Sequence, residues 1–290
     1  MSHRFQHCYG CVNSGNPNRC YRGPVAGSSR LGAPTLRQRV SVRILLVSDL
    51  HYTLRQFDWV VDTSPEFDLV VLAGDQLDIS STVSLDAQIA VVLHYLTLLQ
   101  SAGQVVVSSG NHDLTGDDAN GERAALWLNE ARAAGVPTDG DSLLIGDTLI
   151  TVCPWWDGPV GREAVVAQLA RDGARRSSTW VWVYHWPPLG SPTCWTGRKH
   201  YGDEELGGWI DEHRPDIVLT GHVHDPPFKP DGGWADRIGD TWVFNAGRQI
   251  GPIPTRVELD LDRQRATWVS LLGTEEIDLT DAVTPPRTVF

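Results

Sequence analysis

The sequence predicts an α/β fold, in which short buried strands alternate with longer helices. Three observations lead to this prediction. From residue 41 onward, short runs rich in Val, Ile and Leu recur along the chain, as expected for buried strands. Segments with a helical spacing of apolar residues separate several of these runs. Polar residues directly follow five of the runs, at the ends where the strands of an open α/β sheet line a common crevice.

The strands are predicted from apolar, mostly β-branched runs bounded by turn residues. In chain order they are residues 42–47, 69–72, 104–107, 149–152, 179–184, 217–219, 241–244, 257–261 and 268–271. Helices are predicted over 54–61, 85–99 and 121–134. The second helix has the clearest pattern, because its apolar residues step by 4, 3, 4 and 3 positions along one face, at Leu85, Ile89, Val92, Leu96 and Leu99. Ser84 is expected to cap this helix, and Gly103 lies just past its end.

Composition suits a loop-rich globular protein that binds a small molecule. The chain has 290 residues, of which 41% are hydrophobic and 21% charged, and this length suits one large domain. Its formal net charge of −12 repels polyphosphate backbones, so nucleic acid is not expected as a partner. The most apolar helical stretch, residues 89–99, is shorter than the roughly 20 residues that span a bilayer, so no membrane partner is expected.

Residues 1–40 differ in composition from the rest. The first 48 residues contain seven Arg and no Asp or Glu, whereas the rest of the chain contains 17 basic and 36 acidic residues. Residues 1–40 also lack an apolar period, so we predict a disordered Arg-rich extension there. One folded domain is predicted over 41–279, followed by a loose C-terminal tail over 280–290.

Two alternatives remain for residues 1–40. An organelle transit peptide fits the composition, although glycine and proline interrupt any amphipathic helix, and a secretory signal is not expected because no apolar run precedes Val40. A zinc knuckle would use Cys8, Cys11 and Cys20 with His3 or His7. The other two cysteines, Cys153 and Cys194, are isolated in sequence, which favours a reducing, cytoplasmic location.

Side chains able to bind metal ions follow five of the predicted strands. They are Asp49 and His51, then Asp75, then Asn111 with His112 and Asp113, then His185, and finally His222 and His224. Oxygen and imidazole donors without a thiolate favour Mn, Fe or Zn over a structural cysteine site. A set of this size suits two divalent ions, and glycines at 74, 110 and 221 lie directly before three of the polar groups.

Five short motifs carry a resemblance to a known family. In order they are D-x-H at 49–51, G-D-x-x-D at 74–78, G-N-H-D at 110–113, His185, and G-H-x-H at 221–224. Together they resemble the calcineurin-like metallophosphoesterase superfamily. The resemblance implies a four-layer αββα sandwich, in which two mixed sheets are flanked by helices, and makes 41–279 a catalytic domain.

The resemblance also implies a role for each motif residue. One metal ion would be held by Asp49, His51, Asp75 and His224, and the other by Asp75, Asn111, His185 and His222, with Asp75 bridging the two. His112 would protonate the leaving oxygen or stabilise charge on the phosphoryl group, and Asp113 would orient His112. No ligand role is assigned to Asp78. A hydroxide bridging the metals would attack phosphorus in line with the leaving group.

Two loops and a turn are expected to shape the substrate pocket. Trp186 could stack on a base, as could Trp195, while Arg198 and Lys199 could bind a second phosphate. Arg248 follows a later strand and is the remaining candidate for contact with an anionic substrate. The residues 155–158 form the second loop.

The expected activity is hydrolysis of a small phosphomonoester or phosphodiester. Repair exonucleases share the five motifs, so a metal-dependent nuclease is the alternative enzyme, although the chain has no basic groove. The same fold also serves as a non-catalytic scaffold, which is the alternative that is not an enzyme. The sequence makes no prediction about an oligomeric partner.

Overall fold

The structure is a computed structural model that describes residues 42–281 of the chain. The predictions for residues 1–40 and for the tail beyond residue 281 lie outside the described residues. Within the tail, Thr280 and Asp281 are hydrogen-bonded to Asp278. None of the helices between residues 42 and 281 is both long enough and apolar enough to cross a membrane.

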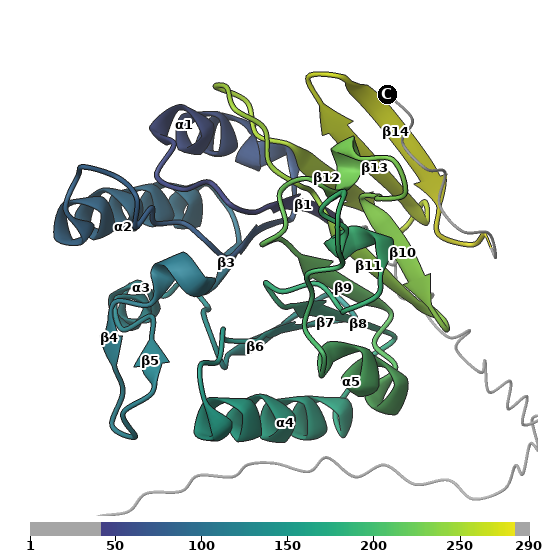
Figure 1. Cartoon of the computed structure of the whole chain (residues 1–290), viewed down its shortest axis with the longest axis horizontal. Coiled ribbons are helices and arrows are strands. Elements are labelled where there is room, and N and C mark those ends of the chain that lie inside the picture. The colour runs from purple at the N-terminus through teal and green to yellow at the C-terminus, as the bar shows by residue number, and fades with distance from the viewer. Residues whose placement is uncertain (1–41, 282–290) are drawn as a thin grey trace, which may run out of the picture. The chain divides into compact units, whose positions relative to one another are not determined.

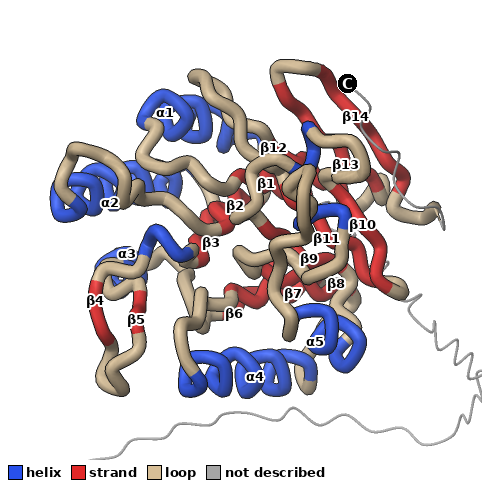
Figure 2. The backbone as a smooth tube through the Cα atoms, in the orientation of Figure 1, coloured by secondary structure: helices blue, strands red, loops and turns tan. Residues whose placement is uncertain are grey.

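Two mixed sheets form the centre of the described domain (Figures 1 and 2). The first sheet has the strand order β14 (Gly273–Asp278), β13 (Arg265–Ser270), β12 (Arg256–Asp260), β1 (Arg43–Val47), β2 (Leu69–Ala73) and β3 (Val105–Ser108). The second has the order β10 (Ala235–Ile238), β11 (Thr241–Asn245), β9 (Ile217–Thr220), β8 (Thr179–Val183), β7 (Thr148–Val152) and β6 (Ser142–Ile145). The strands β1, β2 and β3 run parallel in the first sheet, as do β7, β8, β9 and β11 in the second.

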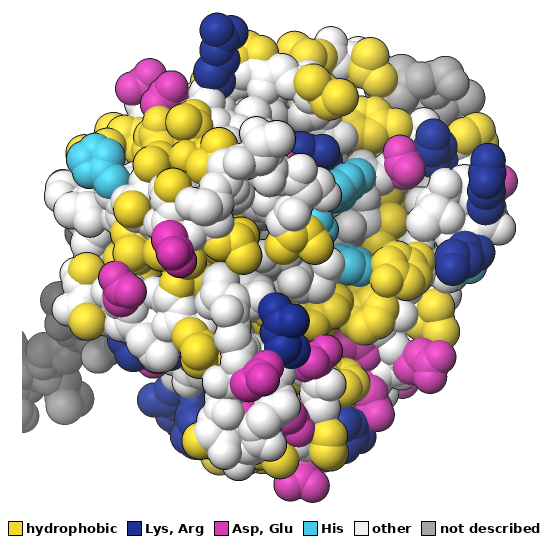
Figure 3. All heavy atoms as spheres, turned by 60° about the vertical axis from the view of Figure 1, so that its left-hand side comes forward, with side chains coloured by type: hydrophobic (Ala, Val, Ile, Leu, Met, Phe, Trp, Pro, Cys, Tyr) yellow, Lys and Arg dark blue, Asp and Glu magenta, His cyan; other side chains and the backbone are white. Residues whose placement is uncertain are grey.

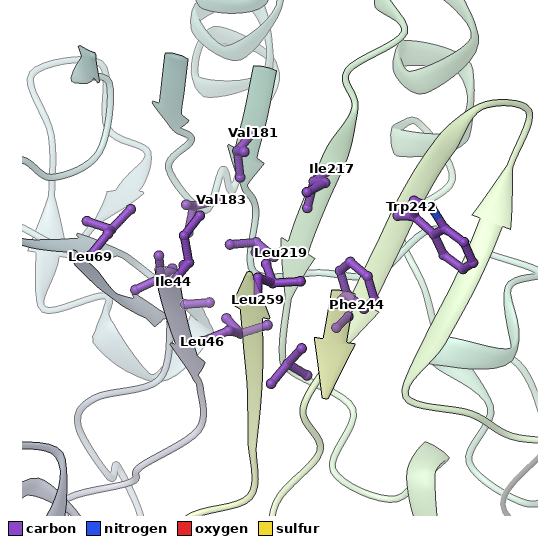
Figure 4. Packing of buried hydrophobic residues seen from close by; sticks show 14 of the residues in the cluster. Ile44, Leu46, Leu69, Val181, Val183, Ile217, Leu219, Trp242, Phe244 and Leu259 are labelled. Carbon is purple, nitrogen blue, oxygen red and sulfur yellow. The ribbon is translucent and has the colours of Figure 1, made fainter. Parts of the chain in front are cut away.

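Side-chain alternation along the strands builds the layers. In β1, Ile44 and Leu46 point into the core between the two sheets, whereas Leu45 and Val47 belong to the core beneath the helices. Figure 4 shows the core between the sheets, where Ile44 and Leu46 face Val183 and Leu219 of the second sheet. Both faces of the strand are therefore apolar, which is why the run reads as continuously hydrophobic.

Helices cover the outer face of each sheet. The helices α1 (Leu54–Thr63), α2 (Leu85–Ala102) and α3 (Leu128–Ala133) pack on the first sheet, and α4 (Pro159–Gly173) and α5 (Leu206–His213) pack on the second. Figure 1 shows α1 and α2 on one side of the paired sheets and α4 on the other. The domain is thus the four-layer αββα sandwich that the resemblance implies, and this prediction is confirmed.

One predicted helix is wrong. In place of a continuous helix over residues 121–134, the structure has a short hairpin of β4 (Gly116–Asp117) and β5 (Arg123–Ala124), and helix begins only at Leu128. The Asp118 carboxylate accepts hydrogen bonds from the backbone N–H groups of Asn120 and Glu122, which closes a turn in place of a helix. The predictions also omit α4, α5, β6, β10 and β14, whose patterns are short or weakly apolar.

Candidate metal centre

The candidate centre lies at the carboxyl ends of parallel strands from both sheets. Asp49, Asp75 and Asn111 follow β1, β2 and β3 of the first sheet, while His185 and His222 follow β8 and β9 of the second. Parallel strands place their carboxyl ends at one edge of a sheet, so residues distant in sequence meet here. Figure 3 shows histidine side chains gathered in a hollow of the molecule, with hydrophobic side chains beside them.

The first cluster consists of Asp49, His51 and His224, whose nearest donor atoms lie within 4.8 Å of one another. Nε2 of His224 is 3.3 Å from Oδ1 of Asp49 and 3.1 Å from Nε2 of His51. Two imidazole nitrogens and a carboxylate oxygen at this spacing suit a single divalent ion between them.

The second cluster consists of Asp75, His185 and His222, again with donor atoms within 4.8 Å. Oδ2 of Asp75 lies 3.4 Å from Nε2 of His185 and 3.7 Å from Nε2 of His51 in the first cluster. The Asp75 carboxylate therefore stands between the clusters, which is the position that a bridging ligand needs.

Backbone conformation aims these side chains. Asp49, His51, Asp75 and His222 all have positive φ, between 42° and 65°, a region that non-glycine residues seldom occupy. Gly110 provides room for the result, because a Cβ there would lie 2.2 Å from Oδ1 of Asp75. Glycine at this position thus permits the close approach of neighbouring ligands, since any side chain there would displace the Asp75 carboxylate.

Protonation states in the site favour cation binding. Burial lowers the pKa of His51 to about 4, and burial together with His185 lowers that of His222 to about 3, so both rings are neutral at pH 7. Burial disfavours the charged form of Asp49, but the hydrogen bond from His224 and the charge of His185 outweigh this and hold its pKa below the usual range. Neutral imidazole and ionised carboxylate are the forms that bind metals.

His185 differs from the other histidines. Its Nδ1 lies 2.5 Å from the carbonyl oxygen of Ala73, so this nitrogen carries the proton and Nε2 faces the centre. Burial lowers the pKa of His185, but the facing carboxylate of Asp75 outweighs burial and raises it to about 9. A cation that binds Nε2 takes the place of the proton held there.

Several buried donor atoms fit metal ions better than any protein partner. Both ring nitrogens of His222 and Oδ1 of Asn111 are buried and have no hydrogen-bond partner among residues 42–281. Buried polar atoms are normally paired, because an unpaired one loses its hydration without compensation. The side chains present therefore fit the two divalent ions that the sequence predicts.

His112 and Asp113 lie beside the clusters. The His112 ring packs edge-on against His51 at 4.5 Å, and its backbone N–H donates to Oδ1 of Asp75. The Asp113 carboxylate accepts from the backbone N–H groups of Gly110, Gln76 and Leu77. Within the described residues it does not bond to the His112 ring, so it fixes the loop that carries His112 and not the imidazole itself.

One further carboxylate belongs to this region. Asp78, for which the sequence predicts no ligand role, has a carboxylate oxygen within 4.8 Å of ring nitrogens of His51 and His112. Gln88 of α2 holds Asp78 through the backbone, since its Oε1 accepts from Asp78 N and its Nε2 donates to Asp78 O. The final Asp of the G-D-x-x-D motif is the sequence signal for this position.

The predicted substrate-binding residues divide into two groups. Arg248 is at the centre, where its Nε donates to the carbonyl oxygen of Asp49, and the Trp186 ring lies 5.3 Å from His222. Lys199 lies further out, with Nζ 5.3 Å from the centre of the Tyr201 ring. Arg198 is exposed and forms no ion pair with any described residue.

Comparisons with known proteins agree with this geometry. The sequence profile of the calcineurin-like phosphoesterase family matches residues 42–226, more than half of the 290-residue chain. A search of curated proteins found no match. Among solved structures, the fold is similar to TT1561 of Thermus thermophilus, with a TM-score of 0.53, 16% identity, and coverage of 83% of this chain and 100% of that one.

Two phosphatase structures are also similar in fold. A dimetal phosphatase from Danio rerio has a TM-score of 0.52 at 12% identity, covering 85% of this chain and 99% of that one. A purple acid phosphatase from yellow lupin (Lupinus luteus) seeds has a TM-score of 0.51 at 13% identity, covering 85% of this chain and 53% of that one. These likenesses establish the fold, and the profile match over residues 42–226 establishes that the chain belongs to the calcineurin-like phosphoesterase family.

Proposed function

We propose that this protein is a phosphoric ester hydrolase that uses two divalent metal ions and acts on a small phosphomonoester or phosphodiester. The observation that carries the proposal is the meeting of two donor clusters, with the Asp75 carboxylate between them. Membership of the phosphoesterase family supports it. The names of two structural neighbours, a dimetal phosphatase and a purple acid phosphatase, point to the same chemistry.

The donor set fits the proposed ions and divides into two groups. Asp49, His51 and His224 would hold one ion with Asp75, and His185, His222 and Asn111 would hold the other with the same carboxylate. When bound, two divalent cations supply Lewis acidity, which polarises the phosphoryl oxygens and lets water ionise near neutral pH. Mn, Fe and Zn all accept such nitrogen and oxygen donors.

The remaining side chains would bind and protonate the substrate. Arg248 is held through Nε, so its terminal nitrogens are free of partners among the described residues and can donate to phosphoryl oxygens. The imidazole of His112 lies against His51 at the edge of the clusters, where it can give a proton to the departing oxygen. Asp113 keeps this ring in place through the backbone of its loop.

Hydrolysis assays with a ligand variant test the proposal. We expect the full chain with Mn²⁺ to cleave 4-nitrophenyl phosphate or bis(4-nitrophenyl) phosphate. Asp75→Asn should lower kcat/KM by more than about 100-fold, because even residues that only support a metal ligand cost up to about 100-fold when they are replaced. Asp62→Asn, an exposed position on α1, is the matched control and should retain the activity.

Metal analysis completes the test. Elemental analysis of the purified protein should find close to two equivalents of metal in the control and less in Asp75→Asn. If neither ester is cleaved with Mn²⁺, Fe²⁺ or Zn²⁺ and no ion is retained, the enzyme proposal is wrong and the fold serves as a scaffold.

A further inference from the structure

A cavity of about 410 Å³ opens next to the second metal cluster. Its wall comes from the loops after β7 and β8 and from the segment that leads into α5, and it includes Trp186, His200, Tyr201, Asp203, Glu204 and Glu205. The rings of Trp186 and Tyr201 each lie 5.3 Å from the His222 ring. An ester with its phosphoryl group at the metal clusters can therefore extend its organic part into this cavity.

The aromatic wall forms a corner. The ring centres of Trp186 and Tyr201 are 5.7 Å apart and their planes meet at 58°. Trp155 stacks on Trp186 at 5.0 Å with nearly parallel planes. The rings of Trp186 and Tyr201 are not parallel, so a flat base cannot be sandwiched between them. The corner that they form suits a rounded group better.

The charge of the cavity wall is negative. Three carboxylic acids and the imidazole of His200 line the cavity, and no Lys or Arg among residues 42–281 does. Glu205 is paired with Arg162 at 2.8 Å, and Asp203 is hydrogen-bonded to the Tyr184 hydroxyl and the Glu205 backbone. Glu204 is exposed, and its carboxylate has no ion pair or hydrogen bond with any described residue. One carboxylate thus remains free to meet a cation.

The Tyr201 ring already lies near an ammonium group, that of Lys199. Nζ of Lys199 lies 5.3 Å from the centre of the Tyr201 ring, within the roughly 6 Å range of a cation–π contact. The Lys199 side chain is exposed, so a ligand can displace it. The contact with Tyr201 accounts for a lysine beside an acidic cavity, so no second phosphate is needed to explain Lys199.

We propose that this cavity binds an organic ammonium group carried by the ester that the protein hydrolyses, an inference that rests on the proposed function. Aromatic faces and a free carboxylate together recognise a substituted ammonium, because the ring quadrupoles and the carboxylate both attract positive charge. The same carboxylate would repel the second phosphate of a nucleotide tail.

Two ligands that differ only in charge test the proposal. The first is 3-(trimethylammonio)propylphosphonate, and the second is its carbon isostere 4,4-dimethylpentylphosphonate, neither of which can be hydrolysed as an ester. Titration calorimetry on the full chain with Mn²⁺ should show at least about tenfold tighter binding of the cationic ligand, equal to about 1.4 kcal/mol. Equal dissociation constants would overturn the proposal.

Variants locate the preference in the cavity. The measured quantity is the dissociation constant of the neutral ligand divided by that of the cationic ligand. Tyr201→Leu and Glu204→Gln should each reduce this ratio towards one. Tyr201→Phe keeps the aromatic face and should keep the ratio. Lys199→Met should increase the ratio, since it removes a competing ammonium. Asp62→Asn on α1 is the control, and its ratio should equal that of the wild type. If Glu204→Gln and Tyr201→Leu both leave the ratio unchanged, the cation binds elsewhere and the proposal is wrong.

The outcomes separate this proposal from the proposed function. If 4-nitrophenyl phosphate is cleaved and the phosphonates bind equally, only the ammonium proposal fails. If no ester is cleaved but the cationic ligand binds more tightly, the cavity is an ammonium site and the hydrolase proposal fails. If no ester is cleaved and neither phosphonate binds, both proposals fail.

Discussion

Gly110 lies so close to the donor clusters that any side chain at this position would clash with them. A Cβ at residue 110 would be 2.2 Å from Oδ1 of Asp75 and 2.6 Å from Nε2 of His185. Both atoms belong to proposed ligands, so a Cβ at this position would displace one or both of them. At the scale of single residues, the centre therefore depends on a missing methyl group as much as on its ligands.

Replacing that glycine should weaken metal binding. We expect Gly110→Ala to lower the affinity for Mn²⁺ by about 10- to 100-fold. This is the loss of metal affinity seen when a residue that supports a metal ligand is replaced, and a displaced ligand should have a similar effect. Overpacking should also reduce the free energy of unfolding by about 1–3 kcal/mol. Titration calorimetry and urea unfolding measure the two effects. Gly208→Ala in α5, where a Cβ meets nothing within 4 Å, is the control and should leave Mn²⁺ affinity unchanged.

The buried carboxyl group of Asp139 should make the stability of the fold depend on pH. Burial raises the pKa of Asp139 to about 7, against roughly 3.9 in an unfolded chain. The folded state therefore binds more protons than the unfolded state between these values, and the Asp139 contribution to stability falls as pH rises through this window. Above pH 7 the full cost of a buried charge remains.

Asp139→Asn removes this cost and keeps an oxygen for the Ser109 N–H, which lies 2.8 Å from Oδ1. The variant should gain stability relative to the wild type at pH 8, and the gain should shrink towards pH 5. Urea unfolding at both pH values, with a chelator present, measures the difference. An equal difference at the two pH values would contradict the assigned cause.

At the scale of elements, α2 shows how far local patterns reach. Leu96 and Leu99, which the apolar period places on the core face, are buried, and the helix runs from Leu85 to Ala102. The Ser84 side chain accepts a hydrogen bond from the N–H of Ala87, as expected of a cap. This helix could be predicted because its apolar period, its cap and its terminal Gly103 agree.

Removal of the cap gives a measurable change. Ser84→Ala should lower the free energy of unfolding by about 1 kcal/mol, because an N–H at the start of α2 loses its partner. Gln100→Ala, at an exposed position near the other end of α2, should change it by less than about 0.5 kcal/mol. Urea denaturation compares the two, and equal effects would show that the cap contributes nothing.

Other elements left weaker signals in the sequence. The hairpin of β4 and β5 depends on the turn at Asp118, whereas propensity alone favours a helix from residue 121. The helix α4 buries few apolar side chains, among them Val165 and Leu169, and has little apolar pattern to read. Strand β14 is mostly polar, and its burial alternates only weakly at the edge of the first sheet.

The candidate centre was easier to predict than its surroundings. Each proposed ligand follows a buried strand, and parallel strands bring such ends together whatever their sequence separation. The contacts of Asp113, Lys199 and Arg248 depend on loop conformations, which no period in the sequence encodes. The Asp113 carboxylate, for example, accepts hydrogen bonds from backbone N–H groups of two loops.

At the scale of the whole molecule, the donor clusters join the two sheets. Asp49 and Asp75 follow strands of the first sheet, and His185 and His222 follow strands of the second. Ions held by both sets would link the two halves of the sandwich. Because they would bind only the folded arrangement, they should stabilise it by mass action.

Chelation should therefore lower the Tm of the full chain, and added Mn²⁺ should restore it. At a free concentration about 100 times the dissociation constant, the gain for one site is about 2.7 kcal/mol. Differential scanning calorimetry measures the shift. Asp75→Asn should show a much smaller response, and an equal response in this variant would mean that the ions bind elsewhere.

The core between the sheets has a consequence for ion selectivity. Ile44 and Leu46 of one sheet pack on Val183 and Leu219 of the other, so these side chains determine how far apart the sheets lie. Preferred metal–ligand distances differ between cations by a few tenths of an ångström, for example about 2.0–2.1 Å for Mg²⁺ and about 2.3–2.6 Å for Ca²⁺. If ions bind ligands from both sheets, changes of side-chain volume in this core should alter which ionic radius the centre accepts, although these side chains would not contact an ion.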